Sequence, residues 1–327
     1  MRIPTITLKA PPIIEITSPS SNDGKSQFLY YMITISILPK DIEGIQLGGQ
    51  DTAVVVLDTE SRFHVPRLVQ VMRHHISSRI SSVLDKGQKT IDTLVTATTP
   101  GSDYIETTIA EALKHVHIFH PQSLPSLIAT VHSLPGYLFD PHAHSSSHKR
   151  VASIILDSAS SFYWQDKAEM EMASLPPDSD ARDAAGSRSQ SHYVALASAI
   201  RKASAALKAP VVYTTWNLSS GPNHGAQADG DGFSLRSHLP APWPSLATLR
   251  LVVSRRAVRK FPVGMTGEEA ARQKQSREAA VRRGVFDVSV NKWGSGDWTD
   301  RVVEGLRRRG DGGFEVRVGA EGVVVES

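Results

Sequence analysis

Two apolar runs that end in aspartate constrain the fold of this chain more than any other feature. The run 53–57 reads Ala-Val-Val-Val-Leu and leads into Asp58, and the run 154–156 reads Ile-Ile-Leu and leads into Asp157. Apolar runs of this length are typical of strands buried on both faces of a parallel sheet. Ligands of open α/β sheets bind at the carboxyl ends of such strands. The sequence therefore predicts an α/β fold with a ligand site at that edge.

A third apolar segment, 13–16, precedes a loop that ends in Gly24, Lys25 and Ser26. These three residues match the last positions of the phosphate-binding pattern G-x-x-x-x-G-K-[ST]. In that pattern, backbone N–H groups and the lysine hold phosphates, and the hydroxyl joins the shell of a Mg²⁺ ion. The strand before the loop and the helix after it support this interpretation. We therefore expect a P-loop that binds ATP and Mg²⁺.

The loop departs from the pattern in ways that predict weak binding. Pro19 stands where the first glycine is expected, and proline supplies no N–H. Asp23 adds a negative charge beside the phosphates, whereas Asn22 tolerates the left-handed conformation that a glycine would supply. The cofactor-binding candidates are Asn22, Asp23, Gly24, Lys25, Ser26 and Asp157, of which Ser26 and Asp157 are also the Mg²⁺ candidates.

Alternation of strands and helices continues along most of the chain. Strands are expected at 13–17, 53–58, 116–119, 151–157 and 210–215, and helices at 25–37, 65–84, 123–138 and 191–207. Antiparallel strands are expected at 249–254, 285–290, 314–318 and 322–325, with one helix at 267–283. This order predicts a mainly parallel central sheet with antiparallel C-terminal strands and helices on both faces.

A single domain is expected over 13–327, after an N-terminal lead at 1–12. Three segments rich in Ser, Pro, Gly, Asp or His, at 140–149, 174–190 and 218–244, are expected to be disordered inserts. The chain has no cysteine, which excludes disulfides, thiolate zinc sites and a cysteine nucleophile. It has no run of about 18 apolar residues and no secretory leader, so we expect a soluble intracellular protein without a membrane partner.

Positive charge is concentrated towards the C-terminus. Residues 250–309 hold 15 Lys and Arg against 7 Asp and Glu. Such a surface suits the phosphates of a nucleic acid, although a solvated helix face would have the same composition. The DNA-binding candidates are Arg255, Arg256, Arg259 and Lys260.

The segments 24–26, 57–63 and 156–166 together resemble the core of the RecA-type recombinases and their eukaryotic paralogues. The aromatic triplet Phe-Tyr-Trp at 162–164 is the most specific piece, and the resemblance covers roughly 13–216. It implies a RecA-like P-loop NTPase core without an N-terminal DNA-binding domain. It also implies that Glu60 is the catalytic base. The position of the family's polar sensor, usually a glutamine, falls at Trp216, which puts coupled hydrolysis in doubt.

The resemblance implies a nuclear recombinase paralogue in homologous-recombination repair of DNA double-strand breaks. Its partners would be another recombinase paralogue, the D-type member, together with the recombinase filament and single-stranded or branched DNA. Any enzymatic activity would be weak, DNA-dependent hydrolysis of ATP. Two alternatives stay open: a stand-alone Mg²⁺-dependent P-loop ATPase or phosphotransferase, and a degenerate interaction module that binds neither nucleotide nor DNA.

Overall fold

The structure is a computed structural model that describes residues 10–85, 102–173, 192–217, 227–229, 232–257, 262, 264–282, 284–298, 300–308 and 313–326. Its large sheet contains β1 (Ile13–Thr17), β4 (Ala53–Asp58), β5 (Val116–Phe119), β6 (Val151–Asp157), β7 (Val211–Thr214), β10 (Leu249–Arg255), β11 (Val285–Val290), β12 (Phe314–Val318) and β13 (Val323–Glu326). Two small hairpins pair β2 (Asp41–Ile42) with β3 (Ile45–Gln46) and β8 (Gln227–Asp229) with β9 (Gly232–Ser234). The helices are α1 (Lys25–Ile37), α2 (Val65–Asp85), α4 (Ser102–Leu113), α5 (Leu124–Phe139), α6 (Tyr163–Ala173), α7 (His192–Leu207), α8 (Gly267–Arg282) and α9 (Asp300–Arg308).

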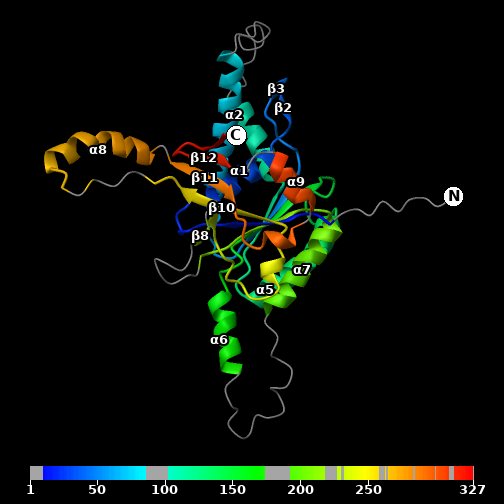
Figure 1. The fold of residues 1–327 in the computed structure, drawn as a ribbon. Helices are drawn as coiled ribbons and strands as arrows, with labels where there is room; N and C mark the ends of the chain where they lie inside the picture. The colour runs from blue at the N-terminus through cyan, green and yellow to red at the C-terminus, as the bar shows by residue number, and fades with distance from the viewer. Residues whose placement is uncertain are drawn as a thin grey trace, which may run out of the picture.

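The strand order of the large sheet is β13-β12-β11-β10-β1-β7-β6-β4-β5. The six strands from β10 to β5 are parallel to their neighbours, and β11, β12 and β13 continue the sheet antiparallel. This confirms the predicted fold class (Figure 1).

One prediction about the C-terminal strands is wrong. β10 is parallel to β1, with Ile14 opposite Leu249 and Thr17 opposite Val252, instead of antiparallel. The reason is the long connection after β7, which returns the chain to the amino end of the sheet. There the backbone N–H of Thr248 donates to the carbonyl of Ile13 at 2.7 Å.

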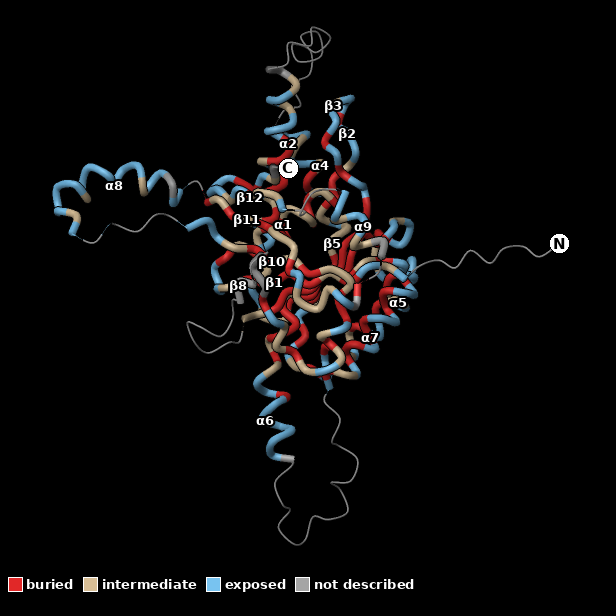
Figure 2. The backbone as a smooth tube through the Cα atoms, viewed as in Figure 1, coloured by how far each residue is buried: buried red, intermediate tan, exposed pale blue. Residues whose placement is uncertain are grey.

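Helices cover both faces of the parallel strands. One hydrophobic cluster joins α5 and α7 to the sheet, and a second joins α1, α2 and α4 to the other side of the same strands and to β11, β12 and β13. The buried residues concentrate in the sheet and on the inner sides of these helices (Figure 2). Strands that are buried on both faces explain why their sequences lack alternation.

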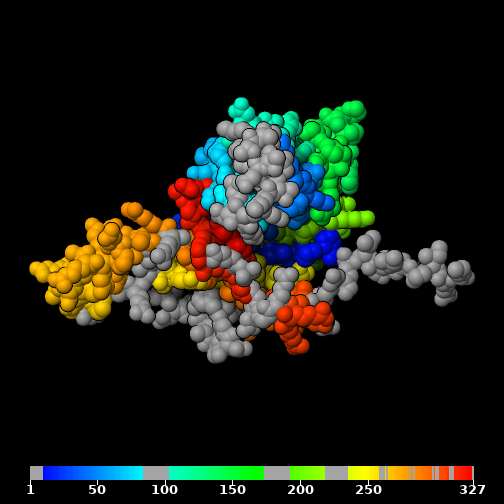
Figure 3. Space-filling model, turned by 90° about the horizontal axis from the view of Figure 1, so that it is seen from above, coloured from blue at the N-terminus to red at the C-terminus, as the bar shows by residue number. Residues whose placement is uncertain are grey.

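Several elements were not predicted, among them α4, α6, α9 and both hairpins. Helices α6 and α8 project away from the sheet (Figure 1), and the projection of α8 is also seen in the space-filling view (Figure 3). Exposed residues cover nearly all of α8 (Figure 2). Such helices lack the apolar stripe that marks a core-facing helix in a sequence. Among the described residues, none of the helices is both long and apolar enough to cross a membrane.

The predicted inserts have different outcomes. Segment 140–149 is described throughout and is packed in turns, with Ser146 buried and the His144 ring 4.7 Å from the ring of Tyr137. Its polar composition misled the prediction because Ser146 anchors it to the segment before β5. The Ser146 hydroxyl donates to the carbonyl of Lys114 and lies 2.9 Å from Nδ1 of His115. Segment 174–190 lies outside the described residues.

The third insert was also predicted wrongly in part. Of 218–244, the residues 218–226 and 230–231 lie outside the described part, but 235–244 pack against the core. Leu235, Leu239 and Trp243 are buried, and the Trp243 indole donates to the carbonyl of Tyr193 at 2.9 Å. These buried side chains, together with the hydrogen bonds between the Asn291 side chain and the backbone of Leu235, hold this segment against the core.

Candidate functional site

A cavity of about 430 Å³ lies at the carboxyl ends of β1, β4, β6 and β7. These strands are neighbours in the order β1-β7-β6-β4, so the residues that follow them meet at one edge, as the sequence analysis expected for the ligand site. The lining residues are Pro19, Ser20, Ser21, Lys25, Ser26, Asp58, Glu60, Arg62, Asp157, Thr214, Trp216 and Asn217.

The loop between β1 and α1 presents a buried cation to this cavity. Lys25 is only 8% exposed, and its ammonium donates a hydrogen bond to the hydroxyl of Ser18. Burial lowers the pKa of Lys25, while the nearby carboxylates of Asp157, Asp23 and Glu60 oppose that shift. A negatively charged ligand would favour the charged form for the same reason as these carboxylates.

The start of α1 suits an anion. Gly24 precedes the helix with φ of 82°, and no side chain caps the first turn of α1. Uncapped N–H groups at a helix N-terminus form a ready site for phosphate. The carboxylate of Asp23 works against such a ligand, since it is buried beside the loop and accepts a hydrogen bond of 2.7 Å from the N–H of Ser20.

Ser26 and Asp157 lie together, although 131 residues separate them. The Ser26 hydroxyl donates to Oδ2 of Asp157 at 3.0 Å, and the Thr214 hydroxyl donates to Oδ1 at 2.5 Å. Burial raises the pKa of Asp157, against the effect of these two hydrogen bonds. Hydroxyl and carboxylate oxygens are the ligands that Mg²⁺ prefers, so the donor set fits this ion.

Glu60 also lines the cavity, and both of its carboxylate oxygens have partners. Its Oε1 accepts a hydrogen bond of 2.8 Å from the indole of Trp216, and its Oε2 lies 3.2 Å from the guanidinium of Arg62. The turn that carries Glu60 is held by Asp58, which accepts hydrogen bonds from the N–H groups of Arg62 and Phe63 at 3.1 and 2.8 Å.

The structure brings together Lys25, Ser26, Glu60 and Asp157, as the site prediction requires. Asn22, Asp23 and Gly24 lie in the loop but do not line the cavity. Sequence reasoning missed Ser18, Arg62 and Thr214. Thr214 had a usable signal, because a polar residue at the end of an apolar strand indicates the same edge of the sheet.

The two basic candidates that the structure describes, Arg255 and Arg256, do not line the cavity. The guanidinium of Arg256 contacts Asp287 and Glu315, and these partners raise its pKa. Arg255 lies over the ring of Phe286, which in turn is packed against Gly24. Arg259 and Lys260 lie outside the described residues.

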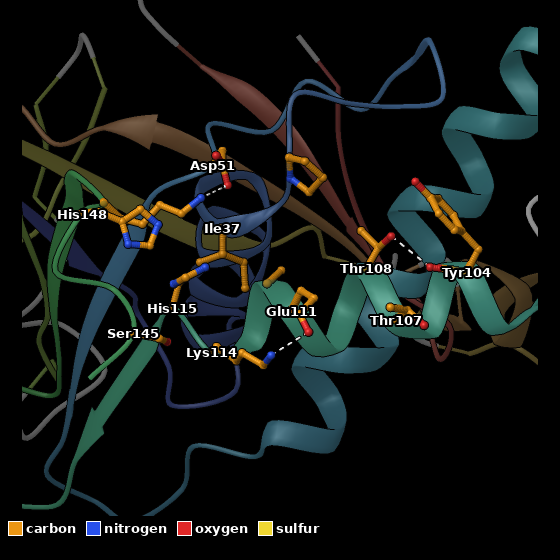
Figure 4. A pocket seen from close by; sticks show the side chains of 13 residues that line it. Ile37, Asp51, Tyr104, Thr107, Thr108, Glu111, Lys114, His115, Ser145 and His148 are labelled. Carbon is orange, nitrogen blue, oxygen red and sulfur yellow. Dashed lines mark hydrogen bonds and ion pairs between the residues drawn. The ribbon is translucent and has the colours of Figure 1, made fainter. Parts of the chain in front are cut away.

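A second cavity of about 570 Å³ lies at the opposite end of the strands (Figure 4). Asp51 and His115 line it just before β4 and β5, and Thr107 and Thr108 line it from α4. Its charged groups are paired with each other: Lys149 with Asp51 at 2.5 Å and Lys114 with Glu111 at 2.6 Å. The lysines that line this second cavity are therefore neutralised by carboxylates. Lys25 at the carboxyl edge instead donates to a hydroxyl.

The mainly parallel sheet, its antiparallel extension and the polar residues at its carboxyl edge define a RecA-like α/β protein. In sequence the chain is similar to two curated proteins. One is the DNA repair protein XRCC2 homolog of Arabidopsis thaliana, 24% identical over an alignment of 183 residues that covers 51% of this chain and 45% of that protein. The other is the DNA repair protein XRCC2 of Mus musculus, 28% identical over 155 residues, 47% of this chain and 42% of that protein.

These similarities have a limited extent. The matches span less than half the length of both curated relatives. No protein-family model matches the chain. The resemblance that the sequence motifs indicated is nevertheless confirmed, in that both relatives are named DNA repair protein XRCC2 or its homolog.

Proposed function

We propose that this chain is a recombinase paralogue of homologous-recombination repair, which binds Mg-ATP weakly and acts mainly in a complex with another paralogue. One observation carries the nucleotide part of the proposal. Lys25, Ser26, Asp157 and Glu60, from three separate points in the sequence, line one cavity at the carboxyl edge of the sheet. The similarity to XRCC2 supports the repair role.

The residues fit different parts of the nucleotide. The uncapped first turn of α1 and the Lys25 ammonium would hold the phosphates. Ser26 and Asp157 would hold Mg²⁺, which neutralises phosphate charge when bound. Asp23 and Pro19 make the loop a poorer phosphate site than the full pattern, so the affinity is expected to be low.

Calorimetry with Mg-ATP on the wild type and on Lys25→Ala tests the nucleotide site. We expect micromolar binding that the substitution abolishes. Lys167→Ala is a matched control, because Lys167 is half-exposed on α6 and contacts the Trp164 ring and Glu171 outside the cavity. Equal binding by Lys25→Ala, or no binding by the wild type, would remove ATP from the proposal.

The proposed partner is the D-type paralogue, and the proposed location is the nucleus, where the recombinase filament and single-stranded or branched DNA are found. Gel filtration of this chain mixed with that paralogue should give one complex. The complex should bind single-stranded DNA with an affinity that falls steeply with salt. Separate elution, with no DNA binding by the mixture, would favour the degenerate interaction module instead.

A further inference from the structure

The side chain of Trp216 donates a hydrogen bond to Glu60, the expected catalytic base. Its Nε1–H donates to Oε1 of Glu60 at 2.8 Å, and both residues line the cavity at the carboxyl edge. Trp216 follows β7 and Glu60 follows β4, and β6 lies between these two strands. The bond therefore spans the carboxyl end of β6, where Asp157 lies.

The framework holds both ends of this bond. The backbone N–H of Trp216 donates to the Ser160 hydroxyl at 3.1 Å, and the preceding residue, Thr215, donates its backbone N–H to the carbonyl of Ile16 at 3.0 Å. On the other side, the Glu60 side chain is 15% exposed, whereas its second partner Arg62 is 80% exposed. An exposed ion pair contributes little, so the indole is the stronger restraint on this carboxylate.

An indole differs chemically from the amide that RecA-type recombinases have at this position. Trp216 has one N–H donor and no acceptor, so it can hold a carboxylate but cannot relay a proton or orient a water by accepting from it. In hydrolysis, Glu60 would accept a proton from water as the water oxygen bonds to the γ-phosphorus. The bond from that phosphorus to the β–γ bridging oxygen breaks, and ADP leaves with the electron pair.

We propose that Trp216 is a positioning residue that keeps Glu60 bonded to the indole, so that the site holds a nucleoside triphosphate without hydrolysing it. The inference rests on the proposed function, because it gives that same site a holding role in place of a catalytic one. It predicts that Trp216 controls the rate of ATP hydrolysis and not the affinity for Mg-ATP.

Single-turnover hydrolysis and calorimetry with Mg-ATP test this on Trp216→Phe and Trp216→Met, which both remove the donor while keeping an apolar side chain. We expect the rate to rise about tenfold or more, within the range that a general base supplies, and the Kd to change by less than about twofold. The double variant Trp216→Phe/Glu60→Gln should return to the wild-type rate. Trp164→Phe is the matched control, since Trp164 is 54% exposed on α6 and does not line the cavity.

The outcomes separate this inference from the proposed function. If the Trp216 variants bind Mg-ATP as the wild type does and hydrolyse it no faster, the inference is wrong and the nucleotide site stands. A rate increase that persists in the double variant also overturns it, because the gain would not pass through Glu60. If neither the wild type nor any variant binds Mg-ATP, both proposals fail. Unfolding midpoints of the variants confirm that folded proteins are compared.

Discussion

Glu15 interrupts the apolar strand β1 with a charge, and its side chain is only 1% exposed. Arg250 lies opposite it on β10, equally buried, with its Nε donating to Oε2 of Glu15 at 2.8 Å. Thr215 donates to the other oxygen at 3.0 Å, and Arg250 also contacts the Pro244 and Trp293 carbonyls. Burial raises the pKa of Glu15, against the effect of Arg250. A charge in a buried strand is tolerated because its partner lies in register on the next strand.

Replacing Glu15 by Ala should destabilise the protein by about 3–5 kcal/mol, because it leaves the Arg250 charge buried without its partner. Urea unfolding measures this change in the free energy of unfolding. Glu315→Ala is the control, since this β12 residue pairs with the half-exposed Arg256 and Arg317 and should destabilise the protein far less. Similar losses for the two variants would contradict the argument.

Asp23 is the residue whose charge most directly opposes phosphate in the loop. Asp23→Asn keeps an oxygen to accept from Ser20 and removes the charge. We expect Mg-ATP to bind roughly fivefold more tightly, equivalent to about 1 kcal/mol for one repulsive charge at close range. Calorimetry measures the affinity, and Asp41→Asn on the exposed part of β2 should leave it unchanged. A weaker complex with Asp23→Asn would show that the loop depends on the carboxylate.

At the scale of the element, two glycines at helices have opposite requirements. Gly24, before α1, has φ of 82°, and a Cβ there would lie 2.9 Å from the Phe286 ring. Gly136 lies inside α5, and a Cβ there would meet nothing within 4 Å. The first position needs glycine for both its backbone conformation and its close contact, and the second does not.

Substitution by alanine should therefore change the free energy of unfolding in opposite directions at these two positions. Gly24→Ala should lower the free energy of unfolding by about 1–2 kcal/mol through left-handed strain and the contact with Phe286. Gly136→Ala should raise it by about 0.5–1 kcal/mol, the helix propensity difference. Thermal and urea unfolding measure both, and a destabilised Gly136→Ala would show that α5 is closer to its neighbours than the structure indicates.

Strand β5 carries a buried histidine against the 140–149 turns. His117 is 6% exposed, its Nδ1 lies 3.0 Å from the Tyr137 hydroxyl, and its Nε2 has no partner among the described residues. Burial, together with the nearby His144 and His115, lowers the pKa of His117 from 6.5 to about 4. The folded state therefore disfavours the protonated ring.

Stability should accordingly depend on pH through this residue. The unfolded chain binds the proton near pH 6.5, and the folded chain binds it only near pH 4. The free energy of unfolding is therefore at its full value above pH 6.5 and decreases as the pH falls towards 4. The loss should reach about 3 kcal/mol at most. The measurement is urea unfolding of the wild type and His117→Phe from pH 4 to pH 7, and the variant should lose less stability. Parallel curves would exclude His117 as the cause.

At the scale of the whole molecule, the core consists of one sheet between two helical layers, and α8 lies outside both (Figure 1). The strands that flank α8 are already paired, with Arg255 opposite Phe286 and the Arg256 N–H bonded to the Val285 carbonyl at 2.9 Å. The helix therefore connects two strands that a short turn could join.

Replacing residues 258–283 by a short Gly-rich turn should change the free energy of unfolding by less than about 1 kcal/mol. A shorter loop lowers the entropy cost of closing the hairpin, and this gain offsets the loss of the small surface that α8 buries. Circular dichroism and urea unfolding check the result. Loss of the folded state would mean that α8 or its flanking residues stabilise the sheet in a way that its exposure does not suggest.

The sequence alone determined the β–α alternation, the buried strands and the loop at Gly24-Lys25-Ser26 between β1 and α1, since apolar runs, helical periodicity and a loop motif are local patterns. It also indicated Lys25, Ser26, Glu60 and Asp157 as site candidates. The sequence did not determine the direction of β10 or the packing of 140–149, because both depend on contacts between distant segments.

Only the tertiary structure decided which residue Trp216 contacts. In the sequence it was a departure from a polar position, and the folded sheet places it across β6 in hydrogen-bond contact with a residue 156 positions earlier. The same is true of Glu15 and Arg250, whose charges are compatible with burial only because two parallel strands align them. Pairing of polar groups across strands is a property of register and distance, which no local pattern specifies.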